Sequence, residues 1–239
     1  MKTHIPGFPR IGAQRELKFA LENYWHGKSS RNELVDMAKA LRMQNWNIQA
    51  ESGMDFATVN DFSLYDQVLD HSVLLGVVPQ RFSDGSCDSF DNYFRMARGR
   101  APSGSATRAC EMTKWFDTNY HYLVPELSVS QQFILNPEKL LAEIAEAQQL
   151  GHQVKPVIPG PITYLWLAKC AAEEFDKLTL LPALLDSYKG LLKLLARKNI
   201  NWVQIDEPAL VLELSPKWQE AYREAYQTLS TCGERKSVV

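Results

Sequence analysis

Short apolar runs alternate with longer amphipathic segments along most of this chain. Four apolar runs have the length of buried strands and are bounded by turn residues, namely 55–59, 113–117, 154–158 and 202–206. A fifth strand is expected to end just before Gly12, and 131–135 is a further short candidate. The pattern therefore predicts a strand followed by a helix, repeated along the chain.

Capping residues mark where several helices begin and end. Ser30 and Glu33 fit a capping box, in which each side chain accepts a hydrogen bond from the other residue's backbone N–H. Asn136, Pro137 and Glu138 form a strong helix start, with an N-cap residue, a proline at the first position and an acid in the first turn. The predicted helices cover about 14–25, 30–52, 64–75, 90–97, 136–150, 161–166, 180–198 and 216–229.

Apolar strands separated by helical crossovers indicate an α/β protein with a parallel sheet. About five core strands are predicted, which fits an open doubly wound sheet or a (βα)8 barrel of the TIM type without its last strands. No glycine-rich dinucleotide fingerprint follows the first strand, and this disfavours the usual cofactor-binding open sheet.

Composition and charge exclude several classes of protein. The chain has 239 residues and a formal net charge of -2, so no global attraction to nucleic acid or an anionic membrane is expected, and any anion site must be local. The four cysteines, Cys87, Cys110, Cys170 and Cys232, lack the close spacing of a zinc or redox motif. Because no signal-peptide core is present and charges interrupt the longest apolar run, 178–196, we expect a soluble, cytoplasmic protein with reduced thiols.

The segment from Gly7 to Lys18 is the most informative part of the sequence. It combines an apolar strand end, a turn that contains Gly12, and a helix whose first turns carry Arg15 and Lys18. Backbone N–H groups and cations thus lie together at a strand-to-helix loop, which is where α/β proteins bind anions. The alternative is that both cations are ordinary solvated residues of an exposed helix.

Polar residues also follow the other predicted strands, where function gathers in parallel α/β folds. These residues are Asn60, Asp61, Lys114, Asp117, Thr163, Tyr164, Asp206 and Glu207. Lys114 has the alternative of a surface lysine at the edge of an aromatic strand. Asp206 and Glu207 end an apolar strand and need partners if they are buried, so they are acid–base candidates or members of an internal salt bridge.

Five sequence motifs occur in this chain in a combination that one known family shares. They are Gly7–Arg10 with Arg15–Lys18, Arg98–Pro102, Thr113–Tyr122, Gly160–Thr163 and Gln204–Leu210. Together they resemble the N-terminal domain of cobalamin-independent methionine synthase, from about Thr3 to Leu229. The resemblance implies a (βα)8 barrel, the first of two barrels that look like an ancient duplication.

The family enzyme transfers a methyl group from 5-methyltetrahydropteroyl-polyglutamate to homocysteine, which forms methionine. The resemblance implies that the N-terminal barrel contributes cations for the polyglutamate tail, whereas the C-terminal barrel holds the zinc and the homocysteine. The tail contacts fall on Gln14, Arg15, Glu16, Leu17 and Lys114, with Lys18, Asp206 and Glu207 as further candidates. A polyanionic tail favours guanidinium and ammonium groups near a helix start, which agrees with the residues themselves.

The chain also departs from the family pattern. The zinc-binding barrel has no counterpart here, and none of the cysteines stands in for its ligands, so no catalytic residue, metal site or resident cofactor is expected. Residues 1–229 are expected to form a partial N-terminal barrel with about five of eight strands. Residues 230–239 are expected to be a tail unlike the family, as in a truncated reading frame.

Three functional hypotheses follow from the resemblance and the departures. The chain supplies the folate-tail half of a split methionine synthase to a separate C-terminal polypeptide, or it is a non-catalytic module that binds folate polyglutamates or another acidic ligand, or it is a folded relic. The isolated chain is expected to be inactive as a methyltransferase, since zinc–thiolate activation of homocysteine is missing. An unpaired apolar edge at 202–205 further predicts a homo-oligomer or a partner chain that covers it.

Overall fold

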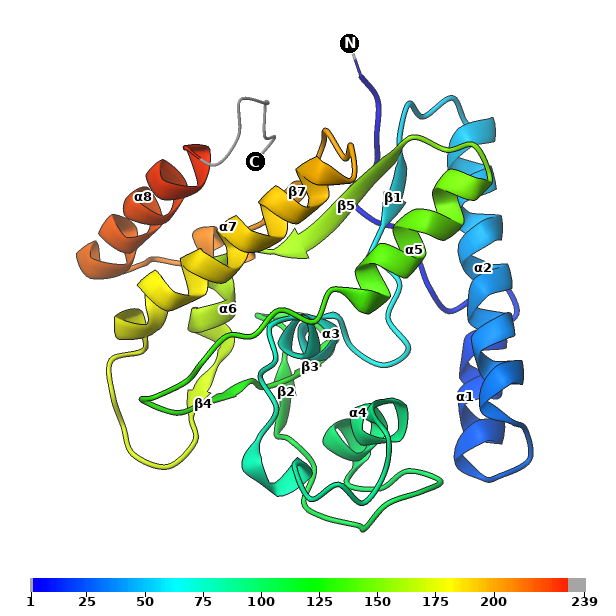
Figure 1. The fold of residues 1–239 in the computed structure, drawn as a ribbon, viewed down its shortest axis with the longest axis horizontal. Helices are drawn as coiled ribbons and strands as arrows, with labels where there is room; N and C mark the ends of the chain where they lie inside the picture. The colour runs from blue at the N-terminus through cyan, green and yellow to red at the C-terminus, as the bar shows by residue number, and fades with distance from the viewer. Residues whose placement is uncertain (1, 232–239) are drawn as a thin grey trace.

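The computed structural model describes residues 2–231 and has the predicted alternation of strands and helices (Figure 1). The helices are α1 (Glu16–Trp25), α2 (Arg31–Glu51), α3 (Gln67–Leu74), α4 (Ser89–Arg98), α5 (Glu138–Gln149), α6 (Pro161–Leu167), α7 (Leu181–Arg197) and α8 (Pro216–Ser230). Short 3₁₀ helices are η1 (Gln80–Phe82), η2 (Lys177–Leu180) and η3 (Pro208–Val211). The strands are β1 (Ala57–Val59), β2 (Met112–Lys114), β3 (His121–Leu123), β4 (Glu126–Leu127), β5 (Val154–Pro159), β6 (Lys169–Cys170) and β7 (Gln204–Asp206).

The central sheet contains β1, β5 and β7 in that order, and its strands are parallel. Val59 pairs with Pro156, and Ile158 pairs with Ile205. Parallel neighbours need long crossovers, and the intervening helices provide them. The prediction of an α/β protein with a parallel sheet is therefore confirmed. Within residues 2–231 the sheet has three strands instead of the predicted five, and no closed barrel is formed.

The predicted strand 113–117 lies outside the central sheet. Its first residues belong to β2, which pairs antiparallel with β3 so that Lys114 lies opposite His121. The chain reverses direction between the two strands near Phe116, whose φ of 51° is left-handed. The aromatic run therefore builds a two-stranded hairpin, because the tight turn returns the chain before it can reach the sheet.

The segment 131–135, a candidate strand, has no strand partner among the described residues. Its backbone bonds instead to the end of α3: Ile134 N–H donates to Leu75 O at 2.9 Å, and Asn136 N–H donates to Leu74 O at 2.8 Å. The carbonyls at a helix C-terminus have no partner within the helix, so they accept these bonds readily. Hydrophobic spacing cannot distinguish this arrangement from a strand.

Most helix boundaries follow the predicted capping signals. The capping box between Ser30 and Glu33 is formed at the start of α2. The start of α5 differs slightly from the prediction, since the helix begins at Glu138 and Pro137 occupies the N-cap position. α8 ends at Ser230, and the remainder of the predicted tail, 232–239, lies outside the described residues.

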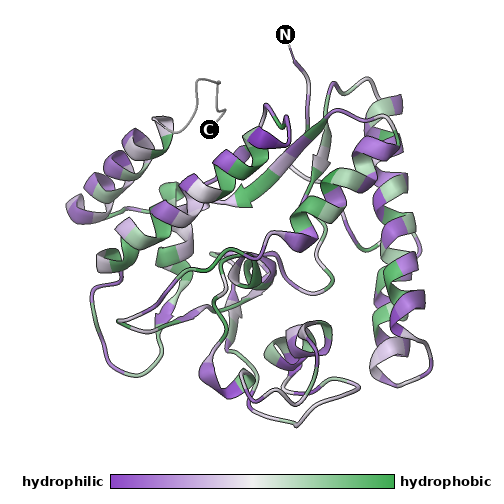
Figure 2. Cartoon of the chain, viewed as in Figure 1, coloured by the Kyte–Doolittle hydropathy of each residue, from purple (hydrophilic) through white to green (hydrophobic). Residues whose placement is uncertain are grey.

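Helices cover one face of the central sheet and bury the main apolar core. α5 packs against β1 and β5, and α2 packs against β1. Val154 and Ile158 of β5 belong to one buried cluster with Leu184 and Leu191 of α7. Figure 2 shows the arrowhead of β5 in green, whereas α2 and α8 alternate between green and purple, as expected for amphipathic helices on the surface.

The other face of the sheet carries the opening segment of the chain, which was predicted to be a strand. Lys155 of β5 is 3% exposed and donates to Ile5 O at 2.9 Å, to His4 Nδ1 at 3.1 Å and to the side chain of Gln204. Thr58 Oγ1 also donates to Ile5 O, at 3.0 Å. Side chains from the sheet therefore satisfy the backbone of this segment, and for this reason it forms no ladder.

Glu207 has a structural position at the end of β7. Its buried carboxylate accepts hydrogen bonds from Ile162 N–H at 3.0 Å, Thr163 N–H at 2.6 Å and the Tyr226 hydroxyl at 3.0 Å. The first two groups are free N–H donors at the start of α6. Burial raises the pKa of Glu207, and these hydrogen bonds oppose that rise. The partners of this acid are thus backbone amides and a tyrosine, and it forms no salt bridge with the described residues.

Replacing Glu207 should destabilise the protein because α6 would lose acceptors for buried donors. For Glu207→Ala we expect the free energy of unfolding to fall by about 3 kcal/mol in urea titration. Glu213→Ala is the matched control, since Glu213 is exposed on the following loop, and it should change stability by less than about 0.5 kcal/mol. Equal effects of the two substitutions would contradict the role of Glu207 as a cap.

Candidate functional site

The turn before α1 has a backbone conformation that its residues must accommodate. Gly12 has a φ of 83°, which is readily adopted only by glycine. Arg15 has a φ of 65°, a conformation that costs a non-glycine residue roughly 1 kcal/mol or more. The turn closes with a hydrogen bond from Arg15 N–H to Gly12 O at 3.1 Å. It therefore holds Arg15 in a fixed place directly before α1.

The two cations of this segment are both accessible. Arg15 is exposed and makes no ion pair with any residue of the described range 2–231. Lys18 lies one turn further along α1 and approaches Glu22 at 3.6 Å, with about two-fifths of each side chain exposed. An exposed pair of this kind is weak. Both cations can therefore interact with an acidic ligand.

The other residues predicted at this segment serve the fold to different degrees. The carboxylate of Glu16 accepts a hydrogen bond from Gln14 N–H at 2.9 Å and so stabilises the turn. The side chain of Gln14 is exposed. Leu17 is 0% exposed and packs in the cluster between α1 and α2. Its side chain cannot touch a ligand from this position.

Arg10 ties the opening segment to the loop that follows β1. Its guanidinium donates to Ser63 O at 2.7 Å and to Tyr65 O at 2.5 Å. These acceptors belong to residues 63–66, which we call the anchor loop. Bidentate contact with two carbonyls fixes both direction and distance. The chain is therefore attached to the anchor loop at Arg10, five residues before Arg15.

Asp66 attaches the β2–β3 hairpin to the same anchor loop. Its side chain accepts hydrogen bonds from the Tyr120 hydroxyl at 2.7 Å and from Leu123 N–H at 3.0 Å. It also caps α3 through Leu69 N–H at 3.0 Å. Asp66 is 1% exposed, and burial raises its pKa while the hydrogen bonds oppose the rise. The hairpin is thus held by a buried carboxylate with three donors.

Lys114 is the last residue of β2 and lies opposite His121 in this hairpin. It is exposed, and no carboxylate among residues 2–231 pairs with it. The hairpin and the turn before α1 are distant in sequence, but Arg10 and Asp66 fasten both to the anchor loop. The structure therefore brings the segments that carry Arg15 and Lys114 onto one support.

The polar residues after β1 hold local structure. Asn60 donates through its side chain to Val157 O at 2.9 Å, and its N–H donates to Glu143 at 3.0 Å. Asp61 accepts a hydrogen bond from Phe8 N–H at 2.8 Å. Burial raises the pKa of Asp61 to about 6. Both residues are occupied in fixing the opening segment and the sheet.

The polar residues after β5 and β7 form hydrogen bonds with α3, η3 and β7. Tyr164 is fully buried and its hydroxyl lies 3.0 Å from Ser72 Oγ, while Thr163 Oγ1 accepts from Ala209 N–H at 3.1 Å. Asp206 accepts from the Gln204 side chain at 2.8 Å, and partial burial raises its pKa. None of these contacts joins Asp206 or Glu207 to the cations described above.

Three residues with decisive contacts were not singled out from the sequence. Arg10 follows directly on the phenylalanine–proline pair of the first motif, Asp66 precedes α3 as an N-cap, and Lys155 interrupts an otherwise apolar strand. A lone lysine in a buried strand signals an internal ion or hydrogen-bond network. Burial lowers the pKa of Lys155 to about 8, although Asp206 and Asp61 oppose the shift.

The described residues bring together no group of three or more His, Cys, Asp or Glu side chains that could hold a metal ion. Cys232 lies outside that range. Of the helices in the range, none combines the length and the apolar character needed to cross a membrane.

Comparison with known proteins identifies the family. The family described as "Cobalamin-independent synthase, N-terminal domain" matches residues 2–239. Proteins named 5-methyltetrahydropteroyltriglutamate–homocysteine methyltransferase from Yersinia enterocolitica and Yersinia pestis are each 54% identical over 229 residues, and one from Sodalis glossinidius is 53% identical over 228 residues. Each comparison covers 95% of this chain and 30% of the relative. The chain thus spans about 30% of the length of these relatives, and it belongs to the cobalamin-independent methionine synthase family as a counterpart of the N-terminal domain.

Proposed function

We propose that this chain supplies the contacts to the polyglutamate tail in a methionine synthase, which transfers a methyl group from 5-methyltetrahydropteroyl-polyglutamate to homocysteine. The name of the relatives specifies a triglutamate in their substrate. The observation that carries the proposal is the pair of accessible cations, Arg15 and Lys114, on segments that share the anchor loop. A chain of linked glutamates presents successive carboxylates to such cations.

Local charge is the physical basis of this proposal. The chain as a whole has a net charge of -2 and so exerts no general attraction on a polyanion. Arg15 and Lys114 form no ion pair within residues 2–231, and the carboxylates of Glu16 and Asp66 are engaged in hydrogen bonds. An acidic tail would therefore bind by specific pairing and would be sensitive to salt.

Binding should depend on the number of glutamates in the ligand. We expect 5-methyltetrahydropteroyl triglutamate to bind more tightly than the monoglutamate by isothermal titration calorimetry. Arg15→Gln and Lys114→Gln should each weaken triglutamate binding about tenfold, which corresponds to roughly 1.4 kcal/mol for a charge-assisted contact.

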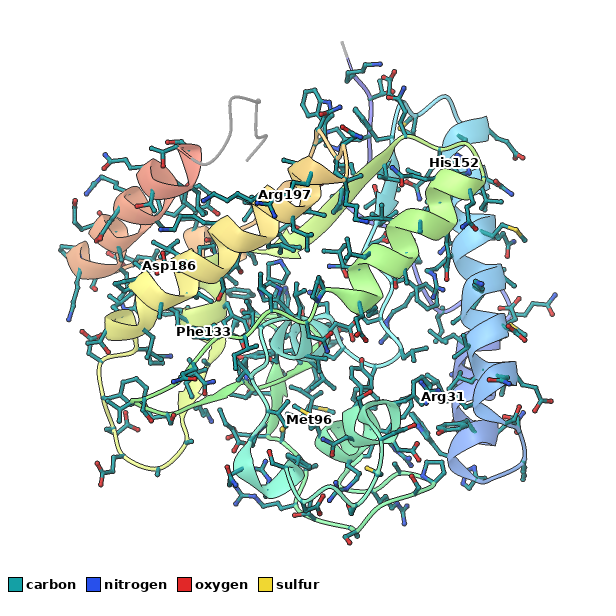
Figure 3. All side chains as sticks on the ribbon, in the orientation of Figure 1. Arg31, Met96, Phe133, His152, Asp186 and Arg197 are labelled. Carbon is teal, nitrogen blue, oxygen red and sulfur yellow. The ribbon has the colours of Figure 1, made fainter. Side chains whose placement is uncertain are left out.

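The control for these substitutions is Arg197→Gln. Arg197 lies at the end of α7, far from α1 in the view of Figure 3, and its replacement removes the same charge. The affinity of the Arg197→Gln variant for the triglutamate should match that of the unmodified chain. Equal affinities for the monoglutamate and the triglutamate would contradict tail binding and favour the interpretation as a relic. Equal affinities of all three variants for the triglutamate would do the same.

The chemistry of methyl transfer requires a further part of the protein. The described cysteines, Cys87, Cys110 and Cys170, do not form a zinc-thiolate set. Burial raises the pKa of Cys110 to about 12, which disfavours the thiolate form that binds zinc. We infer that the zinc centre and the homocysteine site lie outside residues 1–239, and that further strands complete a (βα)8 barrel around the parallel sheet.

The isolated chain should therefore form no methionine from homocysteine and methylfolate triglutamate, even with zinc added. Adding a polypeptide that corresponds to the remaining length of the Yersinia enterocolitica relative should produce turnover, measured as methionine by chromatography. Product formation by the chain alone would contradict the division of roles. Tail binding without any restored turnover would favour a non-catalytic binding module.

The edge of the sheet at β7 is a second place where another chain is expected. β7 pairs with β5 on one side, and no strand of residues 2–231 pairs with its other side. Apolar side chains follow it directly on the surface, among them Leu210, Val211 and Leu212 with exposed fractions of 45%, 79% and 37%. An open strand edge beside exposed apolar residues is a site of association. We infer that a second copy or the C-terminal polypeptide covers this surface.

Sedimentation velocity at micromolar concentrations tests the inference about the edge. The chain alone should sediment as an oligomer, and Val211→Lys should shift it towards the monomer by placing a charge in the contact. Val129→Lys is the matched control, because Val129 is also largely exposed, at 67%, but precedes α5 on another loop. A chain that remains monomeric throughout this range would contradict self-association.

A further inference from the structure

Arg98 differs from the other arginines of the protein that lie over aromatic rings. The others are Arg31 over Phe90, Arg42 over Phe62, and Arg81 and Arg95 over Phe82; they also pair with Asp88, Glu146, Glu126 and Asp84 respectively. Arg98 lies closest to its ring, with the guanidinium carbon 3.8 Å from the centre of Trp25. Its side chain forms no ion pair or hydrogen bond with any residue in 2–231.

The position of Arg98 makes this lack of an acceptor significant. The residue is half-buried at the last position of α4, and α4 ends there because Gly99 adopts a left-handed conformation. Burial lowers the pKa of Arg98, and the neighbouring charge of Arg100 lowers it further. A guanidinium stacked on a ring keeps its N–H edges free for two parallel hydrogen bonds to a carboxylate.

Trp25 supplies a second group that lacks an acceptor. The indole Nε1–H is buried, and no acceptor for it exists among the described residues. Buried donors are almost always paired in proteins, so an unpaired one marks a place where an acceptor is missing. An indole N–H can only donate, and a guanidinium can only donate. The corner formed by Trp25 and Arg98 therefore lacks acceptors, which an oxyanion supplies.

This corner lies on the same stripe of α1 as Lys18, one of the cations proposed for the tail. Lys18, Glu22 and Trp25 follow at intervals of four and three residues, so they share one side of the helix, and Arg15 directly precedes its first turn. The ten residues of α1 place its two ends about 15 Å apart. Figure 1 shows α4 beside the lower end of α1, where Arg98 covers Trp25. Cations thus stand at both ends of this stripe.

We propose that Arg98, stacked on Trp25, binds a distal carboxylate of an oligo-γ-glutamate tail that runs along this stripe from Arg15. The inference rests on the proposed tail-binding function. It identifies Arg98 as the residue whose contact depends on the length of the tail. A monoglutamate bound at Arg15 cannot reach the far end of α1, whereas a longer chain can. Arg98 is therefore a specificity-determining residue for the number of glutamates.

The test uses the full chain with 5-methyltetrahydropteroyl monoglutamate and triglutamate as probes in isothermal titration calorimetry. Arg98→Lys keeps the positive charge but loses the planar fork that makes two parallel bonds. It should weaken triglutamate binding about tenfold and leave monoglutamate binding unchanged. The matched control is Arg197→Lys, the same replacement on α7 (Figure 3), and it should change neither affinity.

A second variant tests the stripe without removing a cation. Glu22 is the one acid between Lys18 and Trp25 on this side of α1, and it pairs with Lys18. Glu22→Gln should therefore tighten triglutamate binding about threefold, with little change for the monoglutamate. An unchanged or weaker affinity for the triglutamate would show that the tail takes another path.

The outcomes separate this inference from the function on which it rests. If the unmodified chain prefers the triglutamate but Arg98→Lys binds it equally well, the role of Arg98 is wrong and tail binding stands. If the unmodified chain shows no preference for the longer tail, tail binding fails and the role of Arg98 fails with it. An equal loss of affinity for both ligands in Arg98→Lys would also contradict the binding of a distal carboxylate by Arg98.

Discussion

The buried carboxylate of Asp66 is the interaction on which the candidate site depends. It receives an N–H donor from α3, which it caps, and an N–H donor from β3 and a hydroxyl donor from Tyr120 in the β2–β3 hairpin, so it joins two segments that are far apart in the sequence. An unpaired buried carboxylate would be strongly unfavourable, and its three donors make the burial tolerable. Arg10 binds the same anchor loop through Ser63 O and Tyr65 O. The segments that carry Arg15 and Lys114 are therefore held in place by these hydrogen bonds.

A buried lysine has a comparable role on the sheet. Lys155 lies 3% exposed beneath the opening segment, where three acceptors surround its ammonium group. The opening segment consequently runs across the open face of the sheet without ladder hydrogen bonds. This arrangement sets the course of the chain towards Arg10 and the turn at Gly12. Successive side chains of a strand point to opposite faces of the sheet. One face can therefore be polar beneath the opening segment while the other packs in the apolar core.

The sequence predicted the positions of the central strands better than the number of strands in the sheet. β1, β5 and β7 appear where the short apolar runs predicted them, and the capping box fixes the start of α2. The opening segment and 131–135, both predicted as strands, form none, and 113–117 is a strand only at its start, because hydrophobic spacing reports burial and not hydrogen-bond partners. The run at 113–117 folds back into a hairpin, and the run at 131–135 bonds to the end of α3. Of the candidate site, Arg15 and Lys114 were named from motifs, whereas Arg10 and Asp66 were not.

The sequence by itself determined that this is an α/β protein with a parallel sheet, that it belongs to the cobalamin-independent methionine synthase family, and which motifs carry its cations. Only the tertiary structure decided which of those residues are available. Leu17 faces the core and Glu207 caps α6, so neither side chain is free, while Arg98 stacks on Trp25 without an acceptor. The reason is physical: residue type and local spacing fix helices, strands and turns, but burial and hydrogen-bond partners arise from contacts between distant segments.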